Sequence, residues 1–113
     1  MITGVHTVLF TPDPERVREF LSDVLGFRSV DAGGGWLIFA LPPSEIAAHP
    51  ADEPGAPELY LMCDDVATTV AELQARDVQI AGPIRDEGWG RVTSISLPGG
   101  GEIGLYEPRH ARP

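Results

Sequence analysis

The sequence predicts an α+β domain built from two tandem βαβββ units. Three observations predict this fold class. An aspartate that can cap a helix stands early in each half, at Asp13 and Asp65. A Gly-Trp pair opens an apolar segment in each half, at Trp36 and Trp89, and a Glu-Ile pair recurs in "SEIAAHP" and "GEIGLYEP". Corresponding points are displaced by nearly the same number of residues, so the whole unit is expected to be duplicated.

The first unit is expected over residues 2–49. "GVHTVLF" alternates with a period of two and predicts a strand. "TPDPERVREFLSDVLGF" predicts a helix, because apolar residues recur on one helical stripe before a capping glycine. "FRSVDA" and "GWLIFAL" predict two strands joined by the "GGG" turn, and "EIAAH" predicts a third.

The second unit is expected over residues 57–108, with the same order of elements. "ELYLMC" predicts a strand and "DDVATTVAELQAR" a helix with an apolar stripe, followed by strands at "VQIAG", "GWGRVTSISL" and "EIGLY". Residues 50–56, rich in Pro, Gly and acidic residues, predict the connector, and residues 109–113 form a tail. Residues 1–113 are thus expected to form one domain.

Composition excludes several classes of function. The net charge is −9 and all eight basic residues are scattered arginines, so no nucleic-acid partner is expected. No stretch approaches the roughly 18 apolar residues of a membrane helix, so no membrane partner is expected either. The first residues do not resemble a signal peptide, and Cys63 is the single cysteine. We therefore expect a soluble cytoplasmic protein, without a nucleophilic role for Cys63, whose acidic neighbours disfavour the thiolate.

Two consecutive βαβββ units, an early strand carrying His6 and the terminal "PGGGEIGLYEP" resemble the vicinal oxygen chelate superfamily. That superfamily includes glyoxalase I, extradiol dioxygenases, fosfomycin-resistance enzymes and bleomycin-binding proteins. The resemblance covers about residues 2–108. It implies that the units fold a mixed sheet into a cup-shaped half-barrel with the helices on the outer face. In the enzymes of this superfamily, a divalent metal in the cup is held by residues of the first and last strands.

The resemblance also implies that the metal site is lost. It places His6 and Glu58 at the ligand positions of the two first strands. At the positions of the last strands, where a glutamate is usual, this chain has Ala47 and Gly104. Neither side chain can ligate a metal, and a catalytic site generally has at least three protein ligands. We therefore expect no cofactor.

A substitute metal site stays open as an alternative. His49 lies two residues after Ala47, and His6, His49 and Glu58 form a 2-His-1-carboxylate set suited to one divalent metal such as Fe, Ni, Zn or Mn. The chain would then be a metal-dependent lyase, isomerase or dioxygenase. A step of two residues moves a side chain about 6.5 Å along a strand, which argues against this set.

A cup without metal predicts a small-molecule-binding protein of the glyoxalase/bleomycin-resistance type. Its apolar walls would hold a hydrophobic or aromatic ligand, as in antibiotic or metabolite sequestration. Whether it is also an enzyme stays open, and a regulatory module without a ligand is a third alternative. His110, in the tail, is expected to be exposed and without a role. The candidate ligand-binding residues are His6, Val8, Phe10, Trp36, His49, Glu58, Tyr60, Met62, Trp89, Gly104 and Tyr106.

A homodimer is the expected assembly. The resemblance implies that unit one of one chain pairs with unit two of the other to complete each cup. Independently, an open sheet face carrying Val8, Phe10 and Tyr60 is a large apolar patch for a monomer to expose. Burial across a two-fold axis would remove that patch from water.

Overall fold

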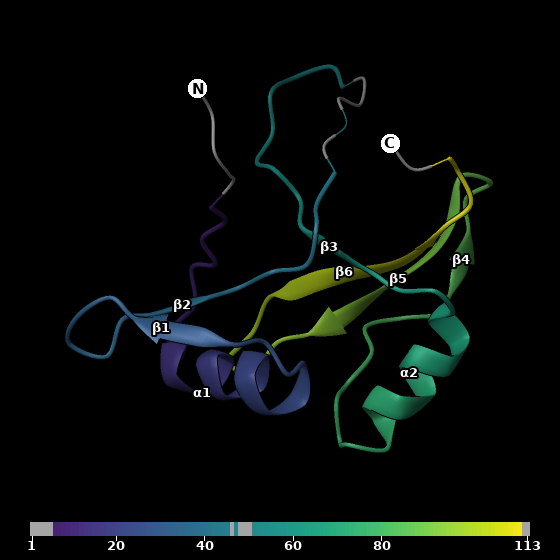
Figure 1. The fold of residues 1–113 in the computed structure, drawn as a ribbon. Coiled ribbons are helices and arrows are strands. Elements are labelled where there is room, and N and C mark those ends of the chain that lie inside the picture. The colour runs from purple at the N-terminus through teal and green to yellow at the C-terminus, as the bar shows by residue number, and fades with distance from the viewer. Residues whose placement is uncertain (1–5, 46, 48–50, 112–113) are drawn as a thin grey trace.

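The computed structural model of the chain describes residues 6–45, 47 and 51–111. It is a small α+β fold with mixed sheets that stay open and curved, as the sequence predicts (Figure 1). In chain order the elements are α1 (Pro14–Glu19), the π-helical segment η1 (Phe20–Val24), β1 (Ser29–Asp31), β2 (Leu37–Phe39), β3 (Tyr60–Met62), α2 (Val66–Gln74), β4 (Arg85–Asp86), β5 (Gly90–Ser96) and β6 (Glu102–Pro108).

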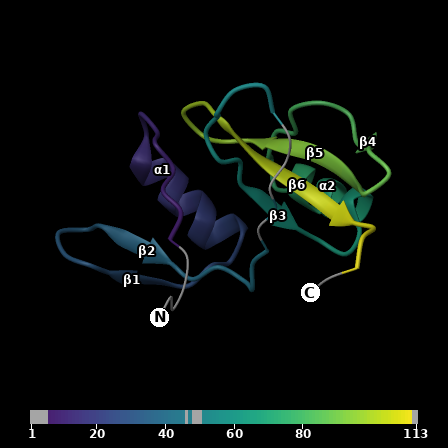
Figure 2. The same cartoon turned by 90° about the horizontal axis from the view of Figure 1, so that it is seen from above.

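The strands form two separate sheets. β1 and β2 make an antiparallel hairpin, and the other four strands are ordered β3-β6-β5-β4, with β3 parallel to β6 and the remaining pairs antiparallel. The hairpin and α1 lie on one side of the molecule, and the four-stranded sheet with α2 lies on the other (Figures 1 and 2). None of the helices in the described part of the chain has the length and apolar content needed to cross a membrane.

The core lies between the four-stranded sheet and the helices. Alternation along β6 turns Ile103 and Leu105 inward, and the β5 residue paired with Ile103 is the fully buried Ile95. The same alternation leaves Gly104 and Tyr106 on the opposite face. The buried core residues are Phe20, Val66, Leu73, Ile95, Leu97, Ile103 and Leu105.

The first helix begins where the sequence predicts and changes geometry along its length. The Asp13 carboxylate accepts a hydrogen bond from the Arg16 amide at 3.3 Å, and Pro14 occupies the first turn. From Phe20 the chain widens into η1, where the Leu25 amide donates to the Phe20 carbonyl at 3.1 Å. The expected apolar stripe is still turned inward, with Val17 and Phe20 buried.

Two carboxylates cap the start of α2. Asp65 accepts from the Thr68 amide at 3.1 Å, and Glu107 accepts from the Val66 amide at 3.0 Å. Asp65 belongs to the helix, whereas Glu107 lies on β6. The second bond therefore fixes the helix to the sheet at its N-terminal end, where unpaired amide groups favour negative charge.

The strand expected at the start of the first unit is not formed in the described residues 6–10. A strand is stable only where a neighbouring strand pairs with its N–H and C=O groups, and alternation in a sequence does not supply that neighbour. Val8 is half exposed and Phe10 is 95% exposed. The prediction of a strand there is wrong for the single chain.

The strand expected at "VQIAG" shrinks to one bridge between Ile80 and Ile95, and the unpredicted β4 pairs with β5 instead. Of the strand expected at "EIAAH", only Glu45 and Ala47 lie among the described residues, and neither is in a strand. The division into units 2–49 and 57–108 joined by residues 50–56 stays a prediction.

Asp65→Ala is expected to lower the free energy of unfolding by about 1 kcal/mol, because the Thr68 amide loses its acceptor. Urea denaturation followed by circular dichroism measures the change. Asp64→Ala is the matched control, since it removes the adjacent exposed carboxylate and leaves the cap intact. Equal destabilisation by the two changes would contradict the capping role.

Candidate functional site

The face of the four-stranded sheet that is turned away from α2 carries a row of large side chains. β6 contributes Gly104 and Tyr106 to this face. In the parallel register of β3 with β6, Tyr60 is the partner of Gly104 and Met62 is the partner of Tyr106. Paired residues of neighbouring strands project to the same side, so these four residues share the open face.

Three aromatic rings meet on this face, with Tyr106 in the middle. The Tyr60 ring lies 5.8 Å from the Tyr106 ring at an interplanar angle of 81°, and the Trp89 ring lies 5.8 Å from it at 69°. Both are edge-to-face contacts, which the ring quadrupoles favour. Tyr60 is 39% exposed and Trp89 is 49% exposed, so much of their ring surface faces solvent. We call Tyr60, Trp89 and Tyr106 the aromatic face.

His110 covers one side of Tyr106. Its ring stacks on Tyr106 with 6.1 Å between centroids and 28° between planes. The tail is held there by Arg109, whose amide donates to the Trp89 carbonyl at 2.9 Å and whose guanidinium donates to Asp86 at 2.7 Å. His110 is exposed, as expected, but it contacts Tyr106, which the sequence did not predict. No spacing in the sequence indicates this residue, because β6 ends at Pro108 and only the tertiary contacts of Arg109 turn the tail back.

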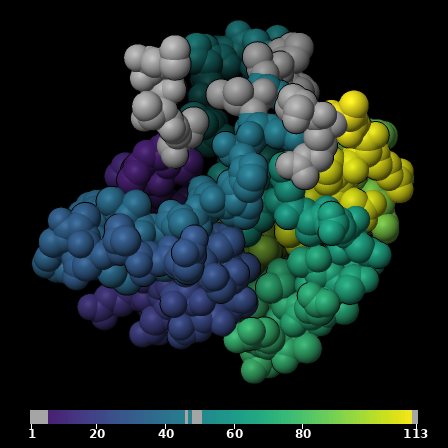
Figure 3. All heavy atoms as spheres, viewed as in Figure 1, coloured from purple at the N-terminus to yellow at the C-terminus, as the bar shows by residue number. Residues whose placement is uncertain are grey.

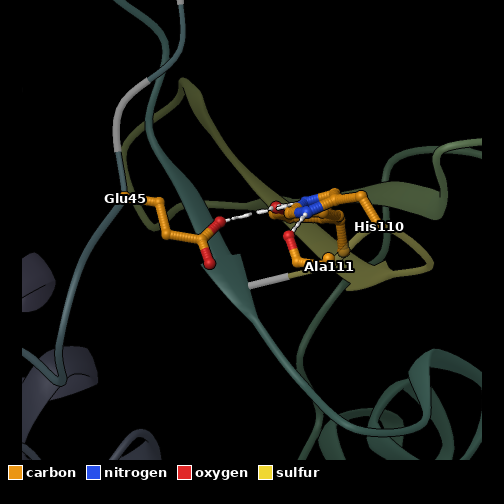
Figure 4. A network of polar contacts seen from close by, with 4 residues as sticks. Glu45, His110 and Ala111 are labelled. Atoms are coloured by element: carbon orange, nitrogen blue, oxygen red, sulfur yellow. Dashed lines mark hydrogen bonds and ion pairs between the residues drawn. The ribbon is translucent and has the colours of Figure 1, made fainter. Parts of the chain in front are cut away.

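A polar network links His110, Tyr106 and Glu45 (Figure 4). The Nδ1 atom of His110 lies 2.8 Å from the Ala111 carbonyl, so in the neutral ring it carries the proton and Nε2 is the acceptor. The Tyr106 hydroxyl then donates to Nε2 across 2.9 Å. Oε2 of Glu45 lies 3.5 Å from the same hydroxyl and 3.8 Å from Nε2. Glu45 belongs to the first half of the chain, so this network joins the two halves at the aromatic face.

The side chain of Tyr60 also forms a hydrogen bond with Glu58, two residues earlier in the chain. Its hydroxyl donates to the Glu58 carboxylate at 2.7 Å. This hydrogen bond, with burial as a smaller cause, raises the pKa of Tyr60 above its ordinary value. Beneath the ring lies Gly104, where an added Cβ would stand 2.6 Å from Cε1 of Tyr60 and nearer still to Cδ1.

A hollow of about 260 Å³ opens beside the aromatic face. Burial, more than the nearby acids, raises the pKa of the Cys63 thiol in its wall. A protonated thiol is a poor nucleophile, in line with the expectation from sequence. The hollow is lined by Met62, Cys63, Asp64, Pro108 and His110.

A second hollow of about 540 Å³ lies on the helix side of the molecule, between η1 and the chain that follows α2 (Figure 3). Arg76 crosses it and donates to the Asp23 carbonyl at 2.9 Å. Its walls carry charged residues such as Arg16 and Glu19, whereas the wall of the first hollow includes His110, which stacks on Tyr106 of the aromatic face. The first hollow is therefore the better candidate for a ligand.

The structure gathers part of the predicted site and separates the rest. Glu58, Tyr60, Met62, Trp89, Gly104 and Tyr106 come together on the second half of the chain. His6, Val8 and Phe10 are exposed in the first half, and Trp36 is 62% exposed there with the Arg18 guanidinium 6.0 Å from its ring. His49 lies outside the described residues.

The described residues do not fit a metal centre. Among residues 6–45, 47 and 51–111, no group of three or more His, Cys, Asp or Glu side chains is placed to hold a metal ion. Gly104 offers no ligand atom, and the Tyr60 ring fills the space that a side chain at that position would need. Glu58 accepts the Tyr60 hydroxyl instead.

A family model described as the Glyoxalase/Bleomycin resistance protein/Dioxygenase superfamily matches residues 4–110. The chain belongs to this superfamily. The match confirms the resemblance found in the sequence, and it leaves the chemistry open because members of one fold differ in function.

Solved structures of superfamily members agree with the fold. TnmS3, an antibiotic binding protein from Streptomyces sp. CB03234, is 30% identical with a TM-score of 0.64, over 96% of this chain and 99% of that one. A glyoxalase/bleomycin resistance protein from the same strain is 31% identical with a TM-score of 0.57, over 84% and 91%. Lactoylglutathione lyase from Agrobacterium tumefaciens, 18% identical with a TM-score of 0.65 over 92% of each chain, shares the fold alone. Comparison with curated proteins found no match.

Tyr60 is expected to lose its phenolic proton at a higher pH than free tyrosine, because the protonated hydroxyl donates to Glu58. The folded-state pKa is raised, so this bond stabilises the protein below the pKa of an unfolded tyrosine and is lost as the pH rises through the raised value. The phenolate absorbance of the wild type minus that of Tyr60→Phe isolates this titration. Glu58→Gln should move the midpoint back toward the ordinary value, and an unmoved midpoint would refute the assignment.

Proposed function

We propose that this superfamily member is a binding protein that holds a hydrophobic or aromatic small molecule against the aromatic face. The observation that carries the proposal is the cluster of Tyr60, Trp89 and Tyr106 on an open sheet face, with exposed ring surface beside a hollow. Exposed rings held in place by neighbouring rings bury apolar ligand area at a low cost in side-chain entropy.

The polar groups around the rings suit a ligand with hydrogen-bond donors at its edge. Each tyrosine hydroxyl already lies near a carboxylate, Glu58 for Tyr60 and Glu45 for Tyr106. These acceptors fix the orientation of a flat molecule, while the rings supply contact area. A role in sequestering an antibiotic or a secondary metabolite follows from this chemistry, and TnmS3, an antibiotic binding protein at 30% identity, supports it.

We propose that binding requires no metal or other cofactor. The support is the poor fit of the described residues to a metal centre, which is clearest at Gly104, Tyr60 and Glu58. The contact between ligand and protein is then stacking and hydrogen bonding alone.

We further propose that two copies of the chain assemble, each completing the other's cup. Phe10 and Val8 present apolar surface with no covering strand among the described residues of a single chain. The β1–β2 hairpin is a sheet of only two strands, which is marginal without further pairing. A second copy would supply pairing partners to both segments and would bury the patch.

The tryptophans make ligand binding measurable. Trp36→Phe leaves Trp89 as the only tryptophan, so quenching of its fluorescence by planar polycyclic aromatics, from naphthol to hydroxypyrene, reports contact with the aromatic face. Saturable quenching that persists with a chelator present is expected. Adding Tyr106→Ala should weaken binding about tenfold, because a stacking surface is lost.

The matched comparison uses the exposed tryptophan of the first half. Replacing Trp36 should leave the affinity of the wild type unchanged when binding is measured by calorimetry. Binding that disappears with the chelator, or about one equivalent of metal retained per purified chain, would overturn the metal-free proposal.

Sedimentation at micromolar concentration is expected to give twice the 12.1 kDa of one chain. Phe10→Asp should shift the protein toward the single-chain mass, because a charge on an apolar patch that association would bury opposes association. Glu15→Asp, on the exposed surface of α1, is the control and should leave the mass unchanged. A wild type that sediments as a single chain would contradict the assembly.

A further inference from the structure

We propose that Tyr60 and Gly104 act as one pair, in which the tyrosine ring rests on the glycine and takes the place of a metal-ligating carboxylate on β6. Gly104 is then a positioning residue for the aromatic face, and Tyr60 is the residue that excludes a metal. This deepens the proposed function, and rests on it only for the consequence for ligand binding.

The contact between the two residues is set by the strand register. Tyr60 and Gly104 are direct partners of the parallel β3–β6 pair and share the open face. The three atoms nearest to a Cβ built on Gly104 are Cδ1, Cε1 and Cγ, and all belong to the Tyr60 ring. The Cγ atom would lie 2.9 Å away, inside the separation that carbon atoms tolerate. A side chain at position 104 and the present position of the ring exclude each other.

The backbone itself does not demand glycine at this position. Gly104 is absent from the glycines with positive φ, and it lies in the middle of a regular strand. Glycine in a strand interior weakens the strand and often marks the close approach of another group. Here that group is the aromatic ring of Tyr60, so the reason for glycine is the ring and not the turn chemistry that explains "PGGG".

Tyr60 also engages the carboxylate of Glu58 through its hydroxyl group. Its hydroxyl donates to Oε2 of Glu58 at 2.7 Å, two residues earlier on the chain. Tyr60 therefore contacts both positions of the second half at which the resemblance to the superfamily places metal ligands. Its ring fills the space that a carboxylate side chain at position 104 would need. Its hydroxyl gives Glu58 a hydrogen-bond donor in place of a cation.

The pair also determines the shape of the ligand surface. Resting on Gly104, the Tyr60 ring stands at 81° to Tyr106 and forms one wall of the aromatic face. Any side chain at position 104 would displace the Tyr60 ring and so change the shape of the aromatic face. Gly104 should thus control ligand affinity without contributing an atom to the ligand contact.

A double-mutant cycle tests the pair without any ligand. Gly104→Ala in the wild type is expected to lower the folding equilibrium constant about tenfold or more, and to lower it much less in a Tyr60→Ala background. A Gly104→Ala chain that is unfolded alone and folded with Tyr60→Ala would support the pair equally well. An equal effect in the two backgrounds would overturn the pair.

Two controls separate the effect of the Tyr60 ring on the cost of Gly104→Ala from other causes. Tyr60→Phe keeps the ring and removes the hydroxyl, so the cost of Gly104→Ala should persist there. Gly100→Ala is strained by a positive φ of 103° and an added Cβ there meets no described atom within 4 Å, so its cost should be the same with and without Tyr60→Ala.

Titration with Ni²⁺ by calorimetry tests the exclusion of metal. Gly104→Glu combined with Tyr60→Ala is expected to bind Ni²⁺ more tightly than Gly104→Glu alone. Equal affinity in the two variants, including none in either, would overturn the role of Tyr60 in excluding a metal. A coupled pair in a protein that binds no aromatic ligand would refute the proposed function and leave the pair standing.

Discussion

The ladder between β5 and β6 is the constraint on which the rest of the molecule depends. It runs without interruption from Gly90 opposite Pro108 to Ser96 opposite Glu102. Since neighbouring residues of a strand point to opposite sides, this one register sends Ile95, Ile103 and Leu105 to the helices and leaves the aromatic residues outside. A slip by one residue would exchange the two sets. The core and the candidate site are therefore two consequences of the same pairing.

Around that ladder, single polar groups fix the other parts in place. Glu107 ties the start of α2 to β6, and the Arg109 amide ties the tail to the carbonyl before β5. Glu45 brings the first half of the chain to Tyr106. Each of these contacts involves β6 or the residue just before β5. The candidate binding surface is thus built on the most regular part of the protein, which favours a preformed site over one assembled by the ligand.

Sequence patterns anticipated the elements whose causes are local. The caps at Asp13 and Asp65 and the alternation of β6 depend on nearest neighbours, and all three appear in the structure. Patterns failed where a distant partner decides, as at residues 6–10, whose alternation is that of a strand but which meet no strand in the described part of the chain. In the site, the sequence shows a small residue at position 104, but its contact with the Tyr60 ring follows only from the register of β3. The sequence gives no indication of the contacts of His110, because a residue beyond the last strand has no periodicity to interpret.

The anchoring of the tail has a practical consequence for anyone handling the protein. Because Arg109 is bonded to Asp86 and His110 stacks on Tyr106, the described part of the tail lies against the aromatic rings. An affinity tag rich in imidazole groups, added at that end, would compete with His110 for the Tyr106 ring and would bring metal-binding side chains close to the aromatic face. Purification handles belong at the other end of the chain.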